Sequence, residues 1–120
     1  MRGGSLEAFR AIDAFAVEAY RVAASIKQGA LGEEIRRNAV RSGAALVAAS
    51  ASPPGSAEQR ESLQRARIGL NEGRYYLYIA RRFGMLDTRR YRALTLRQDA
   101  ALREIQLLLA GAGEVAARAP

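Results

Sequence analysis

The feature that most constrains the fold is a run of small and branched apolar residues spaced alternately three and four apart. It consists of Leu63, Ala66, Leu70, Gly73, Leu77 and Ala80. This spacing places all six residues along one side of an α-helix, where they can form the seam of a helix–helix contact. A β-strand would send neighbouring residues to opposite faces instead. The pattern therefore predicts a long helix over residues 57–83.

The sequence also predicts where this helix begins and ends. Ser56, with Gln59 three residues later, is typical of a capping box at a helix start. Gly84 fits the position just beyond a helix end, where Met85 or Leu86 would close the hydrophobic contact of a Schellman motif.

Three further helices follow from similar spacing, over residues 6–27, 31–51 and 88–110. Ser5 is the expected N-cap of the first helix, and Gly29 is its expected stop. The second helix must end at Pro53 and Pro54, which cannot continue the backbone hydrogen-bond ladder.

The buried sides of these three helices can be predicted as well. The first seam is expected at Phe9, Ile12, Ala16, Ala19, Ala23 and Ile26, widened to one side by Phe15 and Val22. The second is expected at Leu31, Ile35, Ala39, Ser42, Leu46 and Ala49, whose small members allow close approach of a neighbour. The last helix should bury Tyr91, Leu94, Ala101, Leu102, Ile105, Leu108 and Leu109.

Short connections between long helices imply antiparallel neighbours. We therefore expect one all-α domain, an antiparallel up-and-down four-helix bundle over residues 6–110. Residues 1–5 and the Gly- and Ala-rich tail at 111–120 are expected to be flexible.

The composition excludes several kinds of chemistry. The 120 residues include no cysteine and no histidine, so thiolate nucleophiles, zinc–sulfur sites and the commonest general base are absent. No Glu-x-x-His motif for a di-metal site and no glycine-rich phosphate loop after a strand are present. We expect a protein that is not an enzyme and holds no metal or cofactor.

The charge is strongly basic, with a formal net charge of +7 from 18 arginines, one lysine and 12 acidic residues. Such a balance favours polyanionic partners, RNA or DNA first. Abundant arginine and alanine are also typical of GC-rich genomes. No apolar run is long enough to span a membrane, and the first residues lack the apolar stretch of a signal peptide, so we expect a cytoplasmic protein without a membrane partner.

A second apolar stripe lies opposite the seam of the third predicted helix. Ile68, Tyr75 and Ile79 form it, Glu72 lies within it, and Arg82 lies near its end. A helix that is apolar on two opposite faces should be covered on both. We therefore expect these five residues to form an interface with another subunit. The alternative is partial cover by a loop or by long arginine side chains.

The same helix carries a line of arginines at strict seven-residue spacing, namely Arg60, Arg67, Arg74 and Arg81. One interpretation is a solvated or salt-bridged flank, which is the usual role of positions beside a seam. The other is a basic ridge that follows a phosphate backbone.

Arginines of the second predicted helix are further nucleic-acid candidates, namely Arg36, Arg37 and Arg41. Arg37 and Arg41 form a like-charged pair four residues apart, which is unfavourable unless an anion lies near. Glu33 can supply that anion locally. Tyr75, Tyr76 and Tyr78 beside the arginine line are interface residues or surfaces for base stacking.

Particular residues of the third helix resemble a known family. They are Ala66-Arg67, Leu70, Glu72, Leu77, Ile79-Ala80, Arg82-Phe83-Gly84 and Leu86, joined in the second helix by Leu31, Ile35-Arg36-Arg37 and Ala39-Val40. This pattern resembles the four-helix bundle family of 23S rRNA intervening-sequence proteins, over about residues 9–109. The chain departs from the family at residues 45–49, where Ala-Leu-Val-Ala-Ala replaces Asn-Ile-Ala-Glu-Gly.

The resemblance implies a ring-like homopentamer without implying an activity. A related branch, the accessory variability proteins of diversity-generating retroelements, implies nucleic acid and a reverse transcriptase as partners. Two functions remain open from the sequence. One is a basic nucleic-acid-binding or ribonucleoprotein accessory protein, and the other is a purely structural oligomeric scaffold or protein-interaction module without nucleic-acid affinity.

Overall fold

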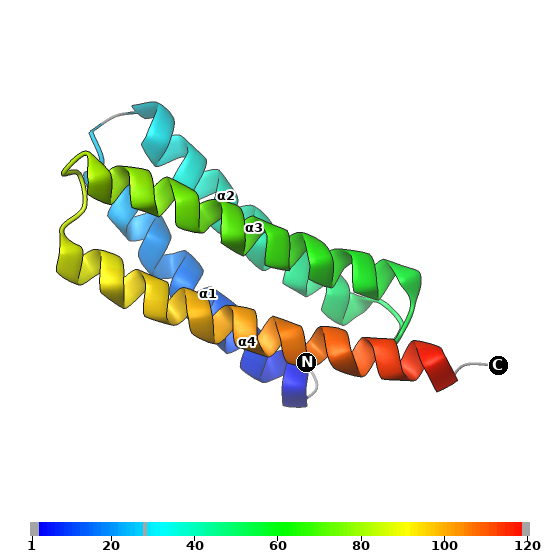
Figure 1. Cartoon of the computed structure of the whole chain (residues 1–120). Coiled ribbons are helices and arrows are strands. Elements are labelled where there is room, and N and C mark those ends of the chain that lie inside the picture. The colour runs from blue at the N-terminus through cyan, green and yellow to red at the C-terminus, as the bar shows by residue number, and fades with distance from the viewer. Residues whose placement is uncertain (1–2, 28, 119–120) are drawn as a thin grey trace.

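The computed structural model describes residues 3–27 and 29–118, with side chains described from Leu6 onward. This part of the chain contains helices and no strands, which confirms the predicted all-α class. The four helices are α1 (Gly3–Ser25), α2 (Gly29–Ala51), α3 (Ala57–Arg82) and α4 (Thr88–Arg118), as labelled in Figure 1.

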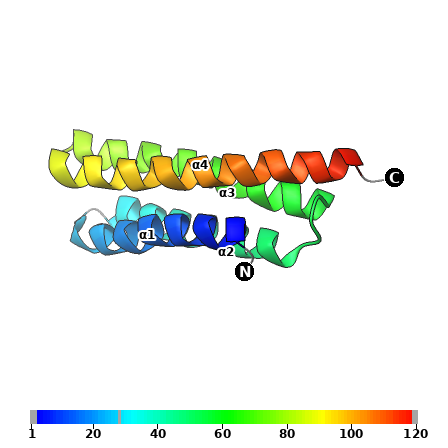
Figure 2. The same ribbon diagram turned by 90° about the horizontal axis from the view of Figure 1, so that it is seen from below.

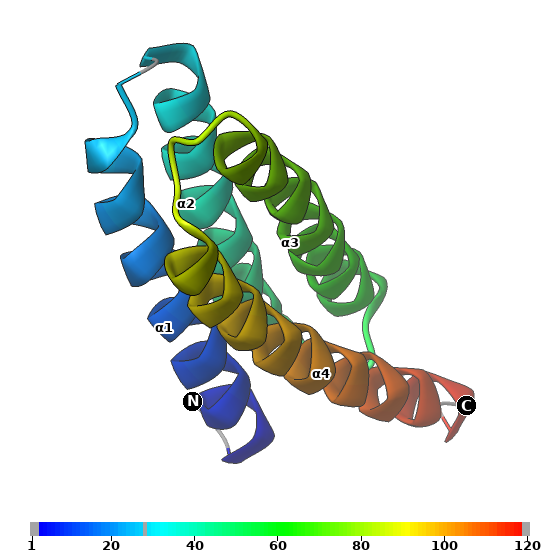
Figure 3. The same cartoon turned by 60° about the vertical axis from the view of Figure 1, so that its left-hand side comes forward.

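Consecutive helices run antiparallel along a bundle with extents of 53 × 23 × 20 Å. Each helix packs against two others: α1 and α3 both contact α2 and α4. Figure 2 shows the result as two layers, with α1 and α2 in one and α3 and α4 in the other. Figure 3 shows that the α1–α2 and α3–α4 connections lie at the same end of the bundle.

The predicted seam of α3 is confirmed, because all six of its members are buried. The seam of α2 is also buried, except that Leu31 is half-exposed. The seam predicted for α1 is confirmed at four of its six members, since Ile12, Ala19, Ala23 and Ile26 are buried, but its centre lies to one side of the predicted line. Phe15 and Val22 lie at its fully buried centre, whereas Phe9 and Ala16 are half-buried. Alanines on several faces of α1 blur the apolar periodicity, so spacing alone does not locate the centre.

The predicted C-terminal cap of α3 is confirmed, and Ser56 is its N-cap, although the Gln59 side chain accepts the Gly55 N–H (2.7 Å) and not the Ser56 N–H of a capping box. The Gln59 backbone N–H donates to Ser56 Oγ over 3.1 Å. At the other end, the Met85 N–H donates to the Ala80 carbonyl (2.8 Å) and the Gly84 N–H to the Arg81 carbonyl (3.0 Å), which is the Schellman pattern. Gly84 has φ +75°, a conformation that favours glycine.

The boundary between α1 and α2 differs from the prediction. α1 begins at Gly3, so Ser5 lies inside the helix and is not its cap. α1 ends at Ser25, whose Oγ donates to the Val22 carbonyl over 2.7 Å. Gly29 is not the stop of α1 but the first residue of α2. Residues 1 and 2 lie outside the described residues.

The last helix is longer than predicted. The apolar spacing predicted an end at residue 110 and a flexible tail beyond it, but α4 continues through Arg118. Two contacts explain the extension, since Ala112 is buried and Val115 lies against Gly55 of the α2–α3 connection. The expectation for residues 111–118 is therefore corrected, and residues 119–120 lie outside the described part of the chain.

Candidate functional site

The arginine line lies on the side of α3 that faces α4, and its central member is bound there. Arg74 Nε donates to Gln98 Oε1 over 3.0 Å, and its Nη2 donates to the Thr95 carbonyl (3.3 Å) and to the Asp99 carboxylate. Gln98 is fully buried and donates from Nε2 to the Leu70 carbonyl over 2.6 Å. Arg74 therefore belongs to a network that joins α3 to α4.

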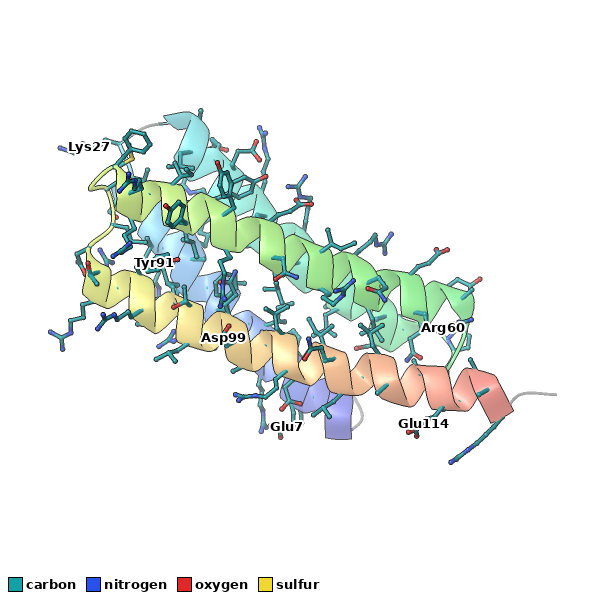
Figure 4. All side chains as sticks on the ribbon, viewed as in Figure 1. Glu7, Lys27, Arg60, Tyr91, Asp99 and Glu114 are labelled. Atoms are coloured by element: carbon teal, nitrogen blue, oxygen red, sulfur yellow. The ribbon has the colours of Figure 1, made fainter. Side chains whose placement is uncertain are left out.

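The other three arginines of the line have different surroundings. The Arg81 guanidinium lies 5.3 Å from the centre of the Tyr91 ring on α4. Arg67 Nε donates to Gln64 Oε1 over 2.8 Å within α3. Arg60 is exposed near the start of the helix (Figure 4), with no ion pair to a described residue. The line is thus salt-bridged at Arg74 and solvated at Arg60, and both settings are those of the first interpretation, a solvated or salt-bridged flank.

The arginines of α2 lie apart from this line. The line is on the side of α3 that faces α4, whereas α2 packs against another side of α3. Glu33 pairs with Arg36 (3.4 Å), and Glu34 rather than Glu33 pairs with Arg37 (3.4 Å). Arg36 also lies over the Tyr20 ring of α1, 5.3 Å from its centre. The seven nucleic-acid candidates therefore do not form one surface.

Arg41 has another setting, because it lines a hollow between α2 and α3. The hollow has a volume of about 470 Å³, and Arg65, Ile68 and Glu72 also line it. Arg65 donates from Nη2 to Ser62 Oγ over 2.9 Å. Two cations, one carboxylate and one aliphatic side chain therefore share this part of the surface.

The floor of this hollow is a close contact between two helices. Asn38 of α2 is buried and donates from Nδ2 to the Gly69 carbonyl of α3 over 2.7 Å. A Cβ atom at Gly69 would lie 2.6 Å from Ser42 Oγ, and a Cβ at Gly73 would collide with the Asn38 side-chain oxygen. The glycines of α3 therefore permit the approach of α2, which agrees with the close approach expected from the small residues of the predicted α2 seam.

The predicted interface residues lie on the outer face of α3. Ile68 is 49% exposed and Tyr75 is 61% exposed, while Ile79 is half-buried. Glu72 and Arg82 are exposed as well, so Glu72 is not a buried carboxylate. The predicted second stripe therefore exists as an apolar surface that no part of the described chain covers fully.

The three neighbouring tyrosines of α3 do not act as one cluster. The Tyr75 and Tyr78 rings stack with their centres 6.4 Å apart and an angle of 27° between their planes. Tyr76 instead is half-buried and packs against the core. Two of the three are thus on the surface.

Neither a metal site nor a membrane-spanning segment is present in the described residues. No group of three or more acidic, histidine or cysteine side chains there is placed to hold a metal ion. No helix in the same residues is both long enough and apolar enough to cross a bilayer.

The comparisons with known proteins find no match. No family model, no curated protein and no solved structure matches this chain. The resemblance to the intervening-sequence proteins therefore rests only on the residues that carry it, and the comparisons neither support nor oppose it.

Two further apolar surfaces were missed by the sequence analysis. A hollow of about 290 Å³ between α1 and α2 is lined by Val17, Tyr20, Val40 and Val47, all of which are exposed. On α4, Leu96 and Leu107 are 69% and 65% exposed. The available signal was the spacing of Val40 and Val47, seven residues apart and off the α2 seam.

Proposed function

We propose that this protein is a non-enzymatic, basic oligomer of four-helix bundles that binds nucleic acid in the cytoplasm. Its role would be that of an accessory protein to a ribonucleoprotein or a reverse transcriptase. The resemblance to the intervening-sequence proteins makes the homopentamer the assembly to test first. Nothing in the proposal requires a metal, a cofactor or a membrane.

The main support for the proposed nucleic-acid binding is an excess of exposed positive charge. In the described residues, ion pairs engage six arginines, namely Arg10, Arg21, Arg36, Arg37, Arg74 and Arg97. The chain has 18 arginines and a net charge of +7. Arginines without carboxylate partners repel one another unless an anion lies between them, and phosphate suits the planar guanidinium.

The oligomeric part rests on the apolar surfaces. The outer face of α3 exposes Ile68 and Tyr75, and the hollow between α1 and α2 exposes Val40 and Val47. Single exposed apolar side chains are common in monomeric proteins, but groups of them on neighbouring helices mark association surfaces. Burial of these surfaces between copies would also multiply the basic surface of one chain.

Filter binding of the purified protein to single-stranded RNA, single-stranded DNA and duplex DNA tests this function. We expect sequence-tolerant binding whose affinity falls steeply and log-linearly with salt concentration, because bound arginines release counterions from the phosphates. An absence of binding to all three nucleic acids at low salt would contradict the proposal.

A second candidate is a structural scaffold without nucleic-acid affinity. The contacts of Arg74 with Gln98 and Asp99 favour it, because they show an arginine of the line stabilising protein structure. If the other arginines act in the same way between subunits, the expected result is a stable oligomer that retains no RNA or DNA on the filter.

A further inference from the structure

The positive charge is concentrated at one end of the bundle. Residues 15–41 and 70–100 form the half of the molecule that holds the α1–α2 and α3–α4 connections (Figures 1 and 3). Among the described residues, this half contains 12 basic and six acidic residues, a net charge of +6, whereas the other half contains six and six, a net charge of zero. The electrostatic potential of the molecule must therefore be strongly asymmetric.

Within this half, the densest basic cluster surrounds the α3–α4 connection. Five arginines lie within 12 residues, interrupted by a single carboxylate at Asp87, and they are Arg81, Arg82, Arg89, Arg90 and Arg92. All five are exposed. The side chain of Asp87 is already engaged, since its Oδ1 accepts the Arg90 backbone N–H over 2.8 Å.

Two of these five arginines line a hollow beside the α3–α4 connection. Arg81, Arg82, Asp87 and Thr88 line a depression of about 480 Å³ between the end of α3 and the start of α4. Lys27, at the end of the α1–α2 layer, points outward from the same end of the molecule (Figure 4). We call this surface, Lys27 with the five arginines, the basic end.

One large aromatic side chain, that of Phe83, is exposed directly after Arg82 at the end of α3. Phe83 is 70% exposed, the largest exposed fraction among the large apolar side chains that the structure describes. Its backbone is held in place by the α3 cap, where its N–H donates to the Ile79 carbonyl over 3.0 Å. An aromatic ring on a fixed backbone, flanked by Arg82 and Arg81, is costly to leave in water and has no role in the bundle core.

We infer that the basic end binds single-stranded nucleic acid, with bases stacking on Phe83 and phosphates contacting Arg82, Arg89 and Arg90. This inference rests on the proposed function and assigns it to one part of the molecule. The arginine line along α3 is then not the main binding surface, in keeping with the engagement of Arg74 by α4.

A single strand fits this surface better than a duplex does. An exposed phenylalanine offers a stacking surface for any base, but only an unpaired base presents a free face to it. The arginines lie on two helix ends beside a depression, so they can contact the phosphates of a flexible, irregular single strand. A duplex is straight and needs a long, straight basic surface.

The first test compares two triple variants of equal charge. One replaces Arg89, Arg90 and Arg92 by Gln at the basic end. The other replaces Arg60, Arg103 and Arg118 by Gln in the opposite half, where these residues are also exposed. In filter binding to single-stranded RNA, we expect the affinity of the first variant to fall about tenfold to a hundredfold. The slope of log affinity against log salt concentration should become shallower by about two to three. The second should lose less than about threefold, from long-range attraction alone.

The second test uses the absence of tryptophan from the chain. Phe83→Trp introduces a single tryptophan at the basic end, and Leu107→Trp introduces one at a similarly exposed position on α4, and either can be excited selectively over the five tyrosines. Single-stranded RNA should quench the fluorescence of the first variant by stacking and leave that of the second nearly unchanged. Phe83→Leu should lower affinity for single strands by about tenfold without changing the salt slope, because one stacked base is lost and no charge.

The outcomes separate this inference from the function on which it rests. If both triple variants lose affinity equally, or if Phe83→Trp fluorescence does not respond to bound RNA, the protein binds nucleic acid at another surface. The inference about the basic end is then wrong, while the proposed function still holds. Tighter binding to duplex than to single strands would also overturn it. If the wild-type protein binds no nucleic acid at low salt, the proposed function and the inference fail together.

Discussion

Arg74 Nε on α3 lies 3.0 Å from Gln98 Oε1 on α4, and the same amide donates from Nε2 to the Leu70 carbonyl over 2.6 Å. A buried glutamine is costly unless its oxygen and its N–H groups are satisfied. Arg74 provides the donor to the oxygen and extends outward to Asp99 at the surface. An arginine of the predicted basic line is thus part of the contact between two helices.

Arg74→Ala should therefore destabilise the fold. It removes three hydrogen bonds and leaves the buried Gln98 oxygen without a donor, which predicts a loss of about 1–2 kcal/mol in the free energy of unfolding. Urea unfolding followed by circular dichroism measures it. Arg67→Ala is the matched control on the same line, and since its only described partner is Gln64 within α3, its loss should stay below about 0.5 kcal/mol. Equal losses would contradict the proposed role of Arg74.

This network shows why the sequence predicted the line but not its function. Seven-residue spacing places Arg60, Arg67, Arg74 and Arg81 on one side of α3. Whether that side meets water, phosphate or a neighbouring helix depends on the direction in which α4 packs. That direction is set by tertiary contacts, which the spacing within one helix does not contain.

The contact between α2 and α3 should tolerate no side chain at Gly73. A Cβ atom there would collide with Asn38, whose amide donates to the Gly69 carbonyl. Gly73→Ala should cost about 2–3 kcal/mol, because overpacking and a lost buried hydrogen bond outweigh the better helix propensity of alanine.

Gly111→Ala is the control for this substitution. Gly111 lies within α4, and an added Cβ would meet nothing within 4 Å. Alanine there should stabilise the protein by up to about 1 kcal/mol. Thermal unfolding should thus shift in opposite directions for the two variants, and a stable Gly73→Ala variant would show that α2 does not approach α3 this closely.

The contact of the α2–α3 connection with the end of α4 can be isolated with a pair of glycines. Gly55 and Gly84 share nearly the same backbone conformation, with φ +76° and +75°, but only Gly55 has a neighbour, since its Cβ would lie 2.6 Å from Val115 Cγ1. Gly84→Ala should cost about 1 kcal/mol from backbone strain alone.

Gly55→Ala should cost about 1–2 kcal/mol more than Gly84→Ala, because its Cβ also displaces Val115. Adding Val115→Ala to Gly55→Ala should recover only part of that difference, because the Cβ of residue 115 (2.9 Å) and the Ala116 backbone nitrogen (3.0 Å) remain close to the added Cβ. Equal effects of the two glycine substitutions in urea unfolding would mean that the last turns of α4 do not pack on this connection.

The oligomer interface is tested by charge on the outer face of α3. Ile68→Glu places a carboxylate within the predicted interface and should shift the mass from a multiple of 13.0 kDa towards 13.0 kDa. Gln106→Glu, an equal charge change at an exposed position of α4, should leave the mass unchanged. An Ile68→Glu variant that stays fully assembled would exclude this face as the interface.

The sequence predicted correctly the elements that have strong local signals. The predictions were wrong where an element depends on contacts between residues far apart in the chain. The capping residues Ser56 and Gly84 of α3 were predicted correctly because they act within a few residues of themselves. The end of α4 was not, because Ala112 and Val115 pack against segments far away in the chain, and two glycines in this region weaken its helix propensity. Phe83 was placed at a helix end and within the family resemblance, but its exposure was not predicted, since the exposure of one ring depends on every element around it.

The most direct test of the whole account is light scattering of the wild-type protein with and without excess single-stranded RNA at low salt. The account predicts an oligomer, at an integer multiple of 13.0 kDa, whose mass rises by that of the bound RNA and returns to the starting value at high salt. A mass of 13.0 kDa that RNA does not change would contradict both the assembly and the binding on which the account depends.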